Sequence, residues 1–176
     1  MIRVLLVDDQ HLVRSGFRMI LQTEDDLTVV GEAANGQEAL SVIERVKPDI
    51  ILLDINMPVL DGIQTLGAIR KKDTAQKILM LTISQNDDDL IGAIVAGANG
   101  YVLKNTEPEI LRNTILQVYG GNSVLAPEIT AKVLQAVRRS QADRNRGLLS
   151  DREVEVLKCL ARGQTTAQDR KSTRLN

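Results

Sequence analysis

Polar side chains stand at the ends of four short apolar runs of the sequence, and their types suggest one shared chemistry. In chain order they are Asp8, Asp9, Asp54, Thr82 and Lys104. Three carboxylates brought together repel one another unless a cation lies between them, and oxygen ligands favour a hard ion such as Mg²⁺. A lysine can pair with one of the carboxylates, and a threonine hydroxyl can donate a hydrogen bond. An aspartate beside Mg²⁺ and an ammonium group is suited to accept a phosphoryl group, because both cations offset charge on the transferred oxygens.

Asp54 is the most informative of these residues, because it directly follows the continuously apolar run IILL. A carboxylate at the end of a buried strand is costly unless it is paired or bound to a metal. Taken singly, each of the five residues has a simpler explanation. Asp54 could be a turn residue, and Asp9 or Gln10 could cap a helix. Thr82 could be an ordinary strand residue, and Lys104 a solvated lysine. Their joint position at the ends of strands favours a common site over these separate explanations.

The first 120 or so residues alternate between strand-like and helical patterns. Several strand-like runs are continuously apolar, which is typical of parallel strands covered on both faces. Crossovers between parallel strands need helices, so the alternation predicts a doubly wound α/β sheet, with ligands bound at the carboxyl ends of its strands. Thr106 is predicted to cap the last helix and Pro108 to lie in its first turn. The predicted strands are 2–8, 28–33, 49–54, 77–82 and 100–104, and the predicted helices are 12–21, 37–46, 63–69, 90–96 and 109–118.

Composition and charge indicate a globular protein of the reducing cytoplasm. The chain is 43% apolar and 26% charged, with a formal net charge of −1, so no overall basic field draws it to nucleic acid or membrane. Cys159 is the single cysteine, which excludes an intrachain disulfide. No apolar stretch reaches the length of a membrane span, and the short apolar run at the N-terminus does not resemble a signal peptide.

The combination of motifs resembles the receiver domain of two-component response regulators over residues 1–121. The motifs are LLVDDQ with the acid pair, LLDINMPVLDG with Asp54, LMLT with Thr82 and GYVLKN with Lys104. The resemblance implies a flavodoxin-like fold with five parallel strands in the order 2-1-3-4-5. It also implies that a sensor histidine kinase is the partner that phosphorylates Asp54.

The resemblance further implies a role for each residue of the site. Mg²⁺ would be held by the carboxylates of Asp8, Asp9 and Asp54 and by the backbone carbonyl of Asn56. Two residues would contact the phosphoryl group, and one aromatic residue would turn inward as the threonine moves: these are Thr82, Lys104 and Tyr101. The alternative for the aromatic is an ordinary half-buried strand residue. His11, beside the acid pair, is expected to be a surface residue without a role.

The sequence after the receiver-like part predicts a different organisation. Residues 122–147 are expected to be a linker helix, 127–141, followed by a polar linker. The stretch LLSDREVEVLKCLARGQTT, within 148–176, resembles the start of a LuxR-type helix-turn-helix, as in NarL/FixJ-type regulators, with a capping box formed by Ser150 and Glu153. A specific DNA interface needs a recognition helix, and no such pattern follows, so the output unit is expected to be truncated and its DNA-binding residues incomplete.

The final residues DRKSTRLN can be back-translated to a sequencing-adapter oligonucleotide, which predicts an artefactual tail from about residue 169. The alternative is a natural basic tail that touches phosphates weakly. DNA is therefore the expected partner of the full-length protein and not of this chain.

Two other functions remain open from the sequence. An aspartate-nucleophile, Mg²⁺-dependent phosphohydrolase also places an aspartate at a strand end, but usually has a second acid two residues later, where this chain has Asn56. A stand-alone receiver would act through protein contacts alone. The preferred interpretation is a response regulator rather than an enzyme, with phosphorylation on Asp54 controlling transcription and favouring a homodimer.

Overall fold

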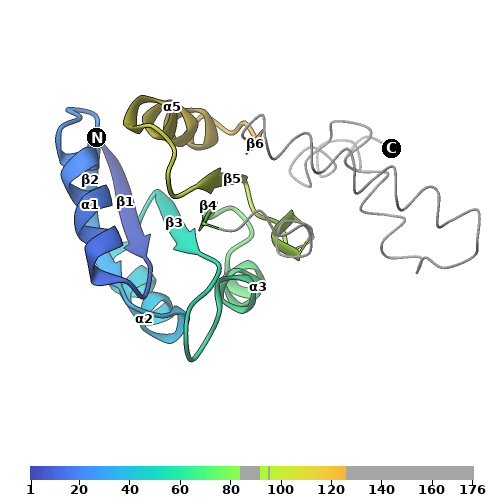
Figure 1. Ribbon diagram of the computed structural model, residues 1–176. Helices are drawn as coiled ribbons and strands as arrows, with labels where there is room; N and C mark the ends of the chain where they lie inside the picture. Colours follow the sequence, from blue (N-terminus) through green and yellow to red (C-terminus); the bar gives the residue numbers. More distant parts are fainter. Residues whose placement is uncertain (84–91, 95, 126–176) are drawn as a thin grey trace, which may run out of the picture. The chain divides into compact units, whose positions relative to one another are not determined.

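A computed structural model of the 176-residue chain describes residues 1–83, 92–94 and 96–125 (Figure 1). All of these residues belong to the first of the two units into which the chain divides, Met1–Ile129. The predicted linker helix, the Ser150–Glu153 capping box and the C-terminal tail lie outside the described residues. The domain boundaries therefore stay predictions.

A parallel β-sheet forms the centre of the described region. Its strand order is β2-β1-β3-β4-β5-β6, and every neighbouring pair is parallel. The predicted order of the first five strands is confirmed. The short sixth strand was not predicted, since two residues give no readable pattern. The strands are β1 (Ile2–Val7), β2 (Leu27–Ala33), β3 (Ile50–Asp54), β4 (Lys77–Thr82), β5 (Gly100–Leu103) and β6 (Val124–Leu125).

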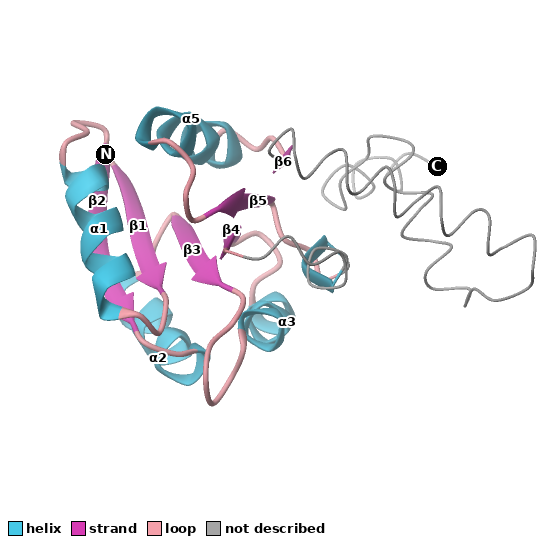
Figure 2. Ribbon diagram, viewed as in Figure 1, coloured by secondary structure: helices cyan, strands magenta, loops and turns pink. Residues whose placement is uncertain are grey.

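Helices cover both faces of this sheet, as the continuously apolar strands predict. α1 and α5 lie on one face, and α2 and α3 lie on the other (Figure 2). The predicted helices at these four positions are confirmed, and of the predicted helix 90–96 the described part, 92–94, is helical. The helices are α1 (His11–Gln22), α2 (Gly36–Val46), α3 (Gly62–Lys72) and α5 (Pro108–Tyr119).

The core is aliphatic and holds β3 in the middle of the sheet. All five residues of β3 are buried, including the terminal Asp54. Apolar side chains of α1 and α5 pack against one side of the strands, among them Phe17, Leu21, Leu111, Ile115 and Val118. A fully buried side chain of this kind stabilises the fold by roughly 1.5–3 kcal/mol. Asp54 is therefore carried by a central strand whose five residues are all buried.

The start of α3 is fixed by a capping box that closes the loop after Asp54. The Asp61 carboxylate accepts a hydrogen bond from the backbone N–H of Gln64 at 2.7 Å, and the Gln64 side chain accepts one from the N–H of Asp61 at 3.2 Å. The prediction for α5 was partly wrong. Pro108 does open the helix, but Glu107 rather than Thr106 takes the cap position, and its side chain makes no capping bond within the described region.

No helix among the residues that the structure describes is long and apolar enough to cross a membrane.

Candidate metal centre

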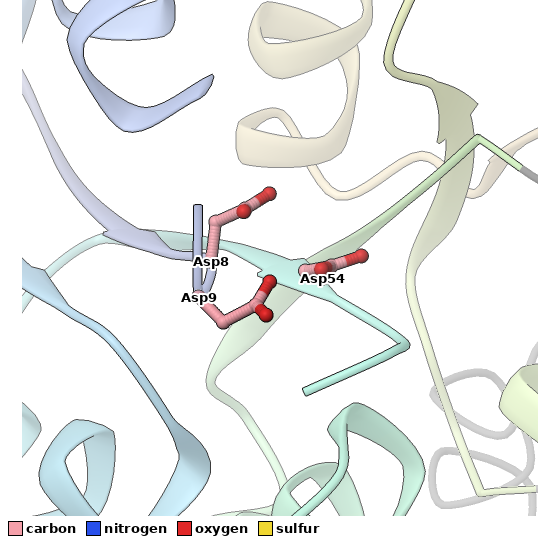
Figure 3. A group of neighbouring side chains, drawn as sticks. All are labelled: Asp8, Asp9 and Asp54. Atoms are coloured by element: carbon pink, nitrogen blue, oxygen red, sulfur yellow. The ribbon is translucent and has the colours of Figure 1, made fainter. Parts of the chain in front are cut away.

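Three carboxylates meet where β1 and β3 end, at the carboxyl edge of the sheet. They belong to Asp8, Asp9 and Asp54, and one oxygen of each lies within 4.8 Å of the others. Figure 3 shows the three side chains projecting to the same side from the ends of the two strands. β1 and β3 are neighbours in the sheet, with Val7 beside Leu53, so the residues that follow these positions come together as the sequence predicts.

Lys104 joins two of these carboxylates. Its Nζ atom lies 2.6 Å from Oδ2 of Asp8 and 2.9 Å from Oδ2 of Asp54. The backbone N–H of Lys104 donates to the carbonyl of Thr82 at 2.8 Å, which fixes the lysine directly after β5. The Lys104 side chain is only 6% exposed, so the explanation as a solvated lysine is wrong. It pairs with two carboxylates, whereas pairing with one carboxylate was expected from the sequence.

Burial and charge make the ionised form of Asp54 unfavourable. Burial raises the pKa of Asp54, and the negative charge of Asp8 raises it further. The hydrogen bond from Lys104 and that from the backbone N–H of Asn56 lower it, but the net pKa lies above the usual 3.8. For Lys104, burial works to lower the pKa, and the hydrogen bonds and charges of Asp8 and Asp54 outweigh it, so the net pKa lies above 10.5. The lysine therefore stays charged at neutral pH.

The donor set fits a hard divalent cation. Among the described side chains at this edge, three carboxylates face one ammonium group, which leaves an excess of two negative charges when all are ionised. Carboxylate oxygens are the ligands that Mg²⁺ prefers, usually completed by water and one or two further oxygens. A bound dication would cancel the excess charge and favour the ionised form of Asp54, against the burial and the repulsion from Asp8 that raise its pKa.

A tight loop after Asp54 holds the strand end in place. The N–H of Gly62 donates to the carbonyl of Ile55 at 2.8 Å. A Cβ atom at Gly62 would lie 2.1 Å from the carbonyl oxygen of Asp54, so only glycine fits. At the tip of the loop, Val59 has φ of 71°, which is rare for a β-branched residue, and Leu60 N–H bonds back to Pro58 at 2.9 Å. The positive φ at Val59 was not predicted from the sequence.

The structure places the other predicted site residues around this edge. Thr82 is fully buried at the end of β4, one residue beyond the position that pairs with Asp54. Asn56 is exposed, two residues after Asp54. Tyr101 is 1% exposed in β5, so the explanation as a half-buried strand residue is wrong. His11 is exposed at the start of α1, as expected.

Contacts that hold Asp8 were missed in the sequence. Gln10 takes the cap position of α1 that the sequence suggested for it or Asp9, but its side chain makes no capping bond among the described residues, and its N–H donates to the Asp8 carboxylate at 2.9 Å. Arg14 Nη1 donates to the backbone carbonyl of Asp8 at 2.6 Å. The only available signal was an arginine one turn into the helix after the acid pair, which looks the same as an ordinary surface arginine.

Comparisons with known proteins agree with this geometry. A family model described as the response regulator receiver domain matches residues 4–116. The chain is 36% identical over 162 residues to the nitrate/nitrite response regulator protein NarL of Escherichia coli (strain K12), covering 91% of this chain and 75% of the relative. It is 39% identical over 168 residues to the uncharacterized transcriptional regulatory protein YhcZ of Bacillus subtilis (strain 168), covering 94% and 78%.

A solved structure is also similar to this chain. The two-component response regulator of the LuxR family from Aurantimonas sp. SI85-9A1 superposes with a TM-score of 0.73 at 33% sequence identity. The match covers 77% of this chain and 97% of that one.

Proposed function

Because the chain belongs to the response regulator receiver family, we propose that it receives a phosphoryl group on Asp54 from a sensor histidine kinase. Membership makes the chain a two-component signalling protein rather than a classical enzyme. The observation that carries the proposal is the position of Lys104, whose ammonium group lies 2.6 Å from Asp8 and 2.9 Å from Asp54. An ammonium group at this position offsets the negative charge that develops on the phosphoryl oxygens during the transfer.

The chemistry follows from the residues at the strand ends. An Asp54 carboxylate oxygen attacks the phosphorus atom of a phosphohistidine, and the P–N bond breaks with its electron pair returning to the imidazole. The product is an acyl phosphate on Asp54. A Mg²⁺ ion held by Asp8, Asp9, Asp54 and the backbone carbonyl of Asn56 would neutralise charge on the phosphoryl oxygens. Lys104 binds one phosphoryl oxygen by its ammonium group, and the capping box and the Gly62 turn keep the attacking strand end fixed.

The readout of phosphorylation is proposed to pass through Thr82 and Tyr101. Both are buried: Thr82 at the end of β4, and Tyr101 in β5, two positions before the residue that pairs with Thr82. The Thr82 hydroxyl would donate to the new phosphoryl group, and Tyr101 would repack as the threonine moves. This repacking would favour a homodimer and control transcription through a NarL/FixJ-type DNA-binding unit. That unit lies outside the described residues, and its truncation stays a prediction.

The phosphohydrolase alternative gains no support from the comparisons, since the reported relatives are regulatory proteins. A mass measurement tests the proposed function directly. The purified chain is incubated with acetyl phosphate and MgCl₂, and its intact mass is recorded. The expected result is the gain of one phosphoryl group, which hydroxylamine removes because acyl phosphates are labile to it.

Two variants complete the mass measurement. Asp54→Asn should gain no phosphoryl group, and EDTA should prevent the gain in the unmodified chain. Asp25→Asn serves as the matched control, because Asp25 is an exposed acid in the turn before β2 and should leave labelling unchanged. Undiminished, hydroxylamine-sensitive labelling of Asp54→Asn would refute the proposal.

A further inference from the structure

The loop 8–10 between β1 and α1 carries two of the three carboxylates and is held from several sides. The backbone N–H of Asp8 donates to the carbonyl of Ala33 in β2 at 3.1 Å. The N–H of Gln10 donates to the Asp8 carboxylate at 2.9 Å. Asp8 is only 2% exposed, so its backbone carbonyl also needs a donor from the protein.

The side chain of Arg14 supplies that donor, and the first backbone hydrogen bond of α1 holds the far end of the loop whatever the residue at position 14. Its Nη1 donates to the carbonyl of Asp8 at 2.6 Å, and its backbone N–H donates to the carbonyl of Gln10 at 3.1 Å. Its Nε donates to Glu32 in β2 at 3.1 Å. The side chains of Arg14 and Glu32 are only 12% and 19% exposed, so solvent screens this ion pair little. Arg18 pairs with the same glutamate.

We propose that Arg14 is a positioning residue for the divalent cation, acting through the backbone of the acid pair. This inference rests on the proposed function, because it concerns the metal site of that function. Asp9 directly follows the residue whose carbonyl the guanidinium holds, so the direction of its carboxylate depends on that side-chain hydrogen bond. Removing Arg14 takes away no carboxylate, but it releases the loop that presents two of them. The cation would then have to order the loop when it binds, and its affinity would fall.

A second arginine offers a matched control at the other end of the sheet. Arg112 in α5 pairs with Glu24 and Asp26, each at 2.6 Å, just before β2 begins. It also joins a helix to the chain around β2 through two acids, but near the amino end of that strand. Its loss should therefore weaken the fold and leave the acid cluster unchanged.

The experiment is a calorimetric titration of the full chain with MgCl₂ at neutral pH. Arg14→Met should bind Mg²⁺ roughly tenfold more weakly than the unmodified chain, as for other residues that orient metal ligands. Arg14→Lys should recover part of the affinity, because a lysine can reach the Asp8 carbonyl but cannot also hold Glu32 through a second nitrogen. Arg112→Met should stay within about twofold of the unmodified chain. Unchanged affinity in Arg14→Met, or an equal loss in Arg112→Met, would overturn the proposal.

A second variant keeps the test decisive if Arg14→Met does not fold. Glu32→Gln retains Arg14 and neutralises its anchor, and should weaken Mg²⁺ binding by roughly threefold. Unchanged affinity in a folded Glu32→Gln chain would then contradict the proposal. The readout also separates this inference from the proposed function. A chain that binds Mg²⁺ in an Arg14-dependent way but gains no phosphoryl group refutes only the proposed function, and a labelled chain whose Mg²⁺ affinity ignores Arg14 refutes only the inference.

Discussion

Replacing Asp54 by asparagine should make the metal-free protein more stable and remove its response to magnesium. The Asp54 carboxylate lies 2.9 Å from Lys104, an attraction of about 6 kcal/mol at an effective dielectric constant near 20. Its hydrogen bond from the N–H of Asn56 adds about 2 kcal/mol. Against these stand burial, which costs several kcal/mol, and repulsion from Asp8, at least about 3.5 kcal/mol because the two carboxylates have oxygens within 4.8 Å of each other.

Taken together, these contributions slightly disfavour the ionised form of Asp54 in the folded protein, in agreement with its raised pKa. Asp54→Asn should therefore raise the unfolding free energy in EDTA by on the order of 1 kcal/mol, or about 2–4 °C in Tm. In the presence of magnesium, the unmodified chain should gain more stability than Asp54→Asn. At a tenfold excess over its dissociation constant, magnesium should stabilise the unmodified chain by about 1.4 kcal/mol, and Asp54→Asn by much less.

The pH dependence has a defined sign. Since the folded-state pKa of Asp54 lies above the unfolded value, its contribution to stability is fully present below pH 3.8 and is lost as pH rises through the folded pKa. The advantage of Asp54→Asn in EDTA should therefore appear as pH rises and be absent in acid. Thermal unfolding of both chains, with Asp25→Asn as control, measures this in EDTA and in MgCl₂. A lower Tm for Asp54→Asn in EDTA, or an equal magnesium shift in both chains, would refute the charge balance.

Two further substitutions test the surroundings of the site by denaturant unfolding. Lys104→Met should lower the unfolding free energy by about 3–5 kcal/mol, because it leaves two buried carboxylates without their cation. Lys72→Met, which breaks an exposed pair with Glu44, should cost far less, and equal losses would contradict the special role of Lys104. Gly62→Ala should destabilise the protein by about 1–3 kcal/mol, since the added Cβ would meet the Asp54 carbonyl at 2.1 Å. At Gly67, also in α3, an added Cβ would meet nothing within 4 Å among the described residues beyond its chain neighbours and its own helix backbone, so Gly67→Ala should stabilise by about 0.5–1 kcal/mol. A neutral Gly62→Ala would refute the close approach.

The sheet and the acid cluster could be predicted because both follow from local patterns. Continuously apolar strands that alternate with amphipathic helices admit few topologies, and an acid at the end of such a strand must lie at the binding edge. Asp8, Asp54 and Lys104 were therefore found from their types and positions alone. That Lys104 bridges two acids could not be read from the sequence, because it depends on side-chain directions from two separate strands.

What the sequence did not predict depends on contacts between distant parts of the chain. Arg14 binds a backbone carbonyl, and a backbone acceptor leaves no mark on residue type. The strained turn at Val59 lacks the glycine or asparagine that usually indicates a positive φ. The cap of α5 was misplaced because threonine is favoured at cap positions, whereas here Pro108 starts the helix directly after Glu107.

The central claim is that the carboxylate at the end of β3 is the group that becomes phosphorylated. The most direct measurement is chemical mapping of the modified residue. The chain is treated with acetyl phosphate and MgCl₂, reduced with borohydride, which converts an aspartyl phosphate to homoserine, and digested for peptide mass spectrometry. We predict homoserine at position 54 and at no other aspartate. Homoserine at position 8 or 9, or a labelled chain that retains an unreduced Asp54, would contradict the account.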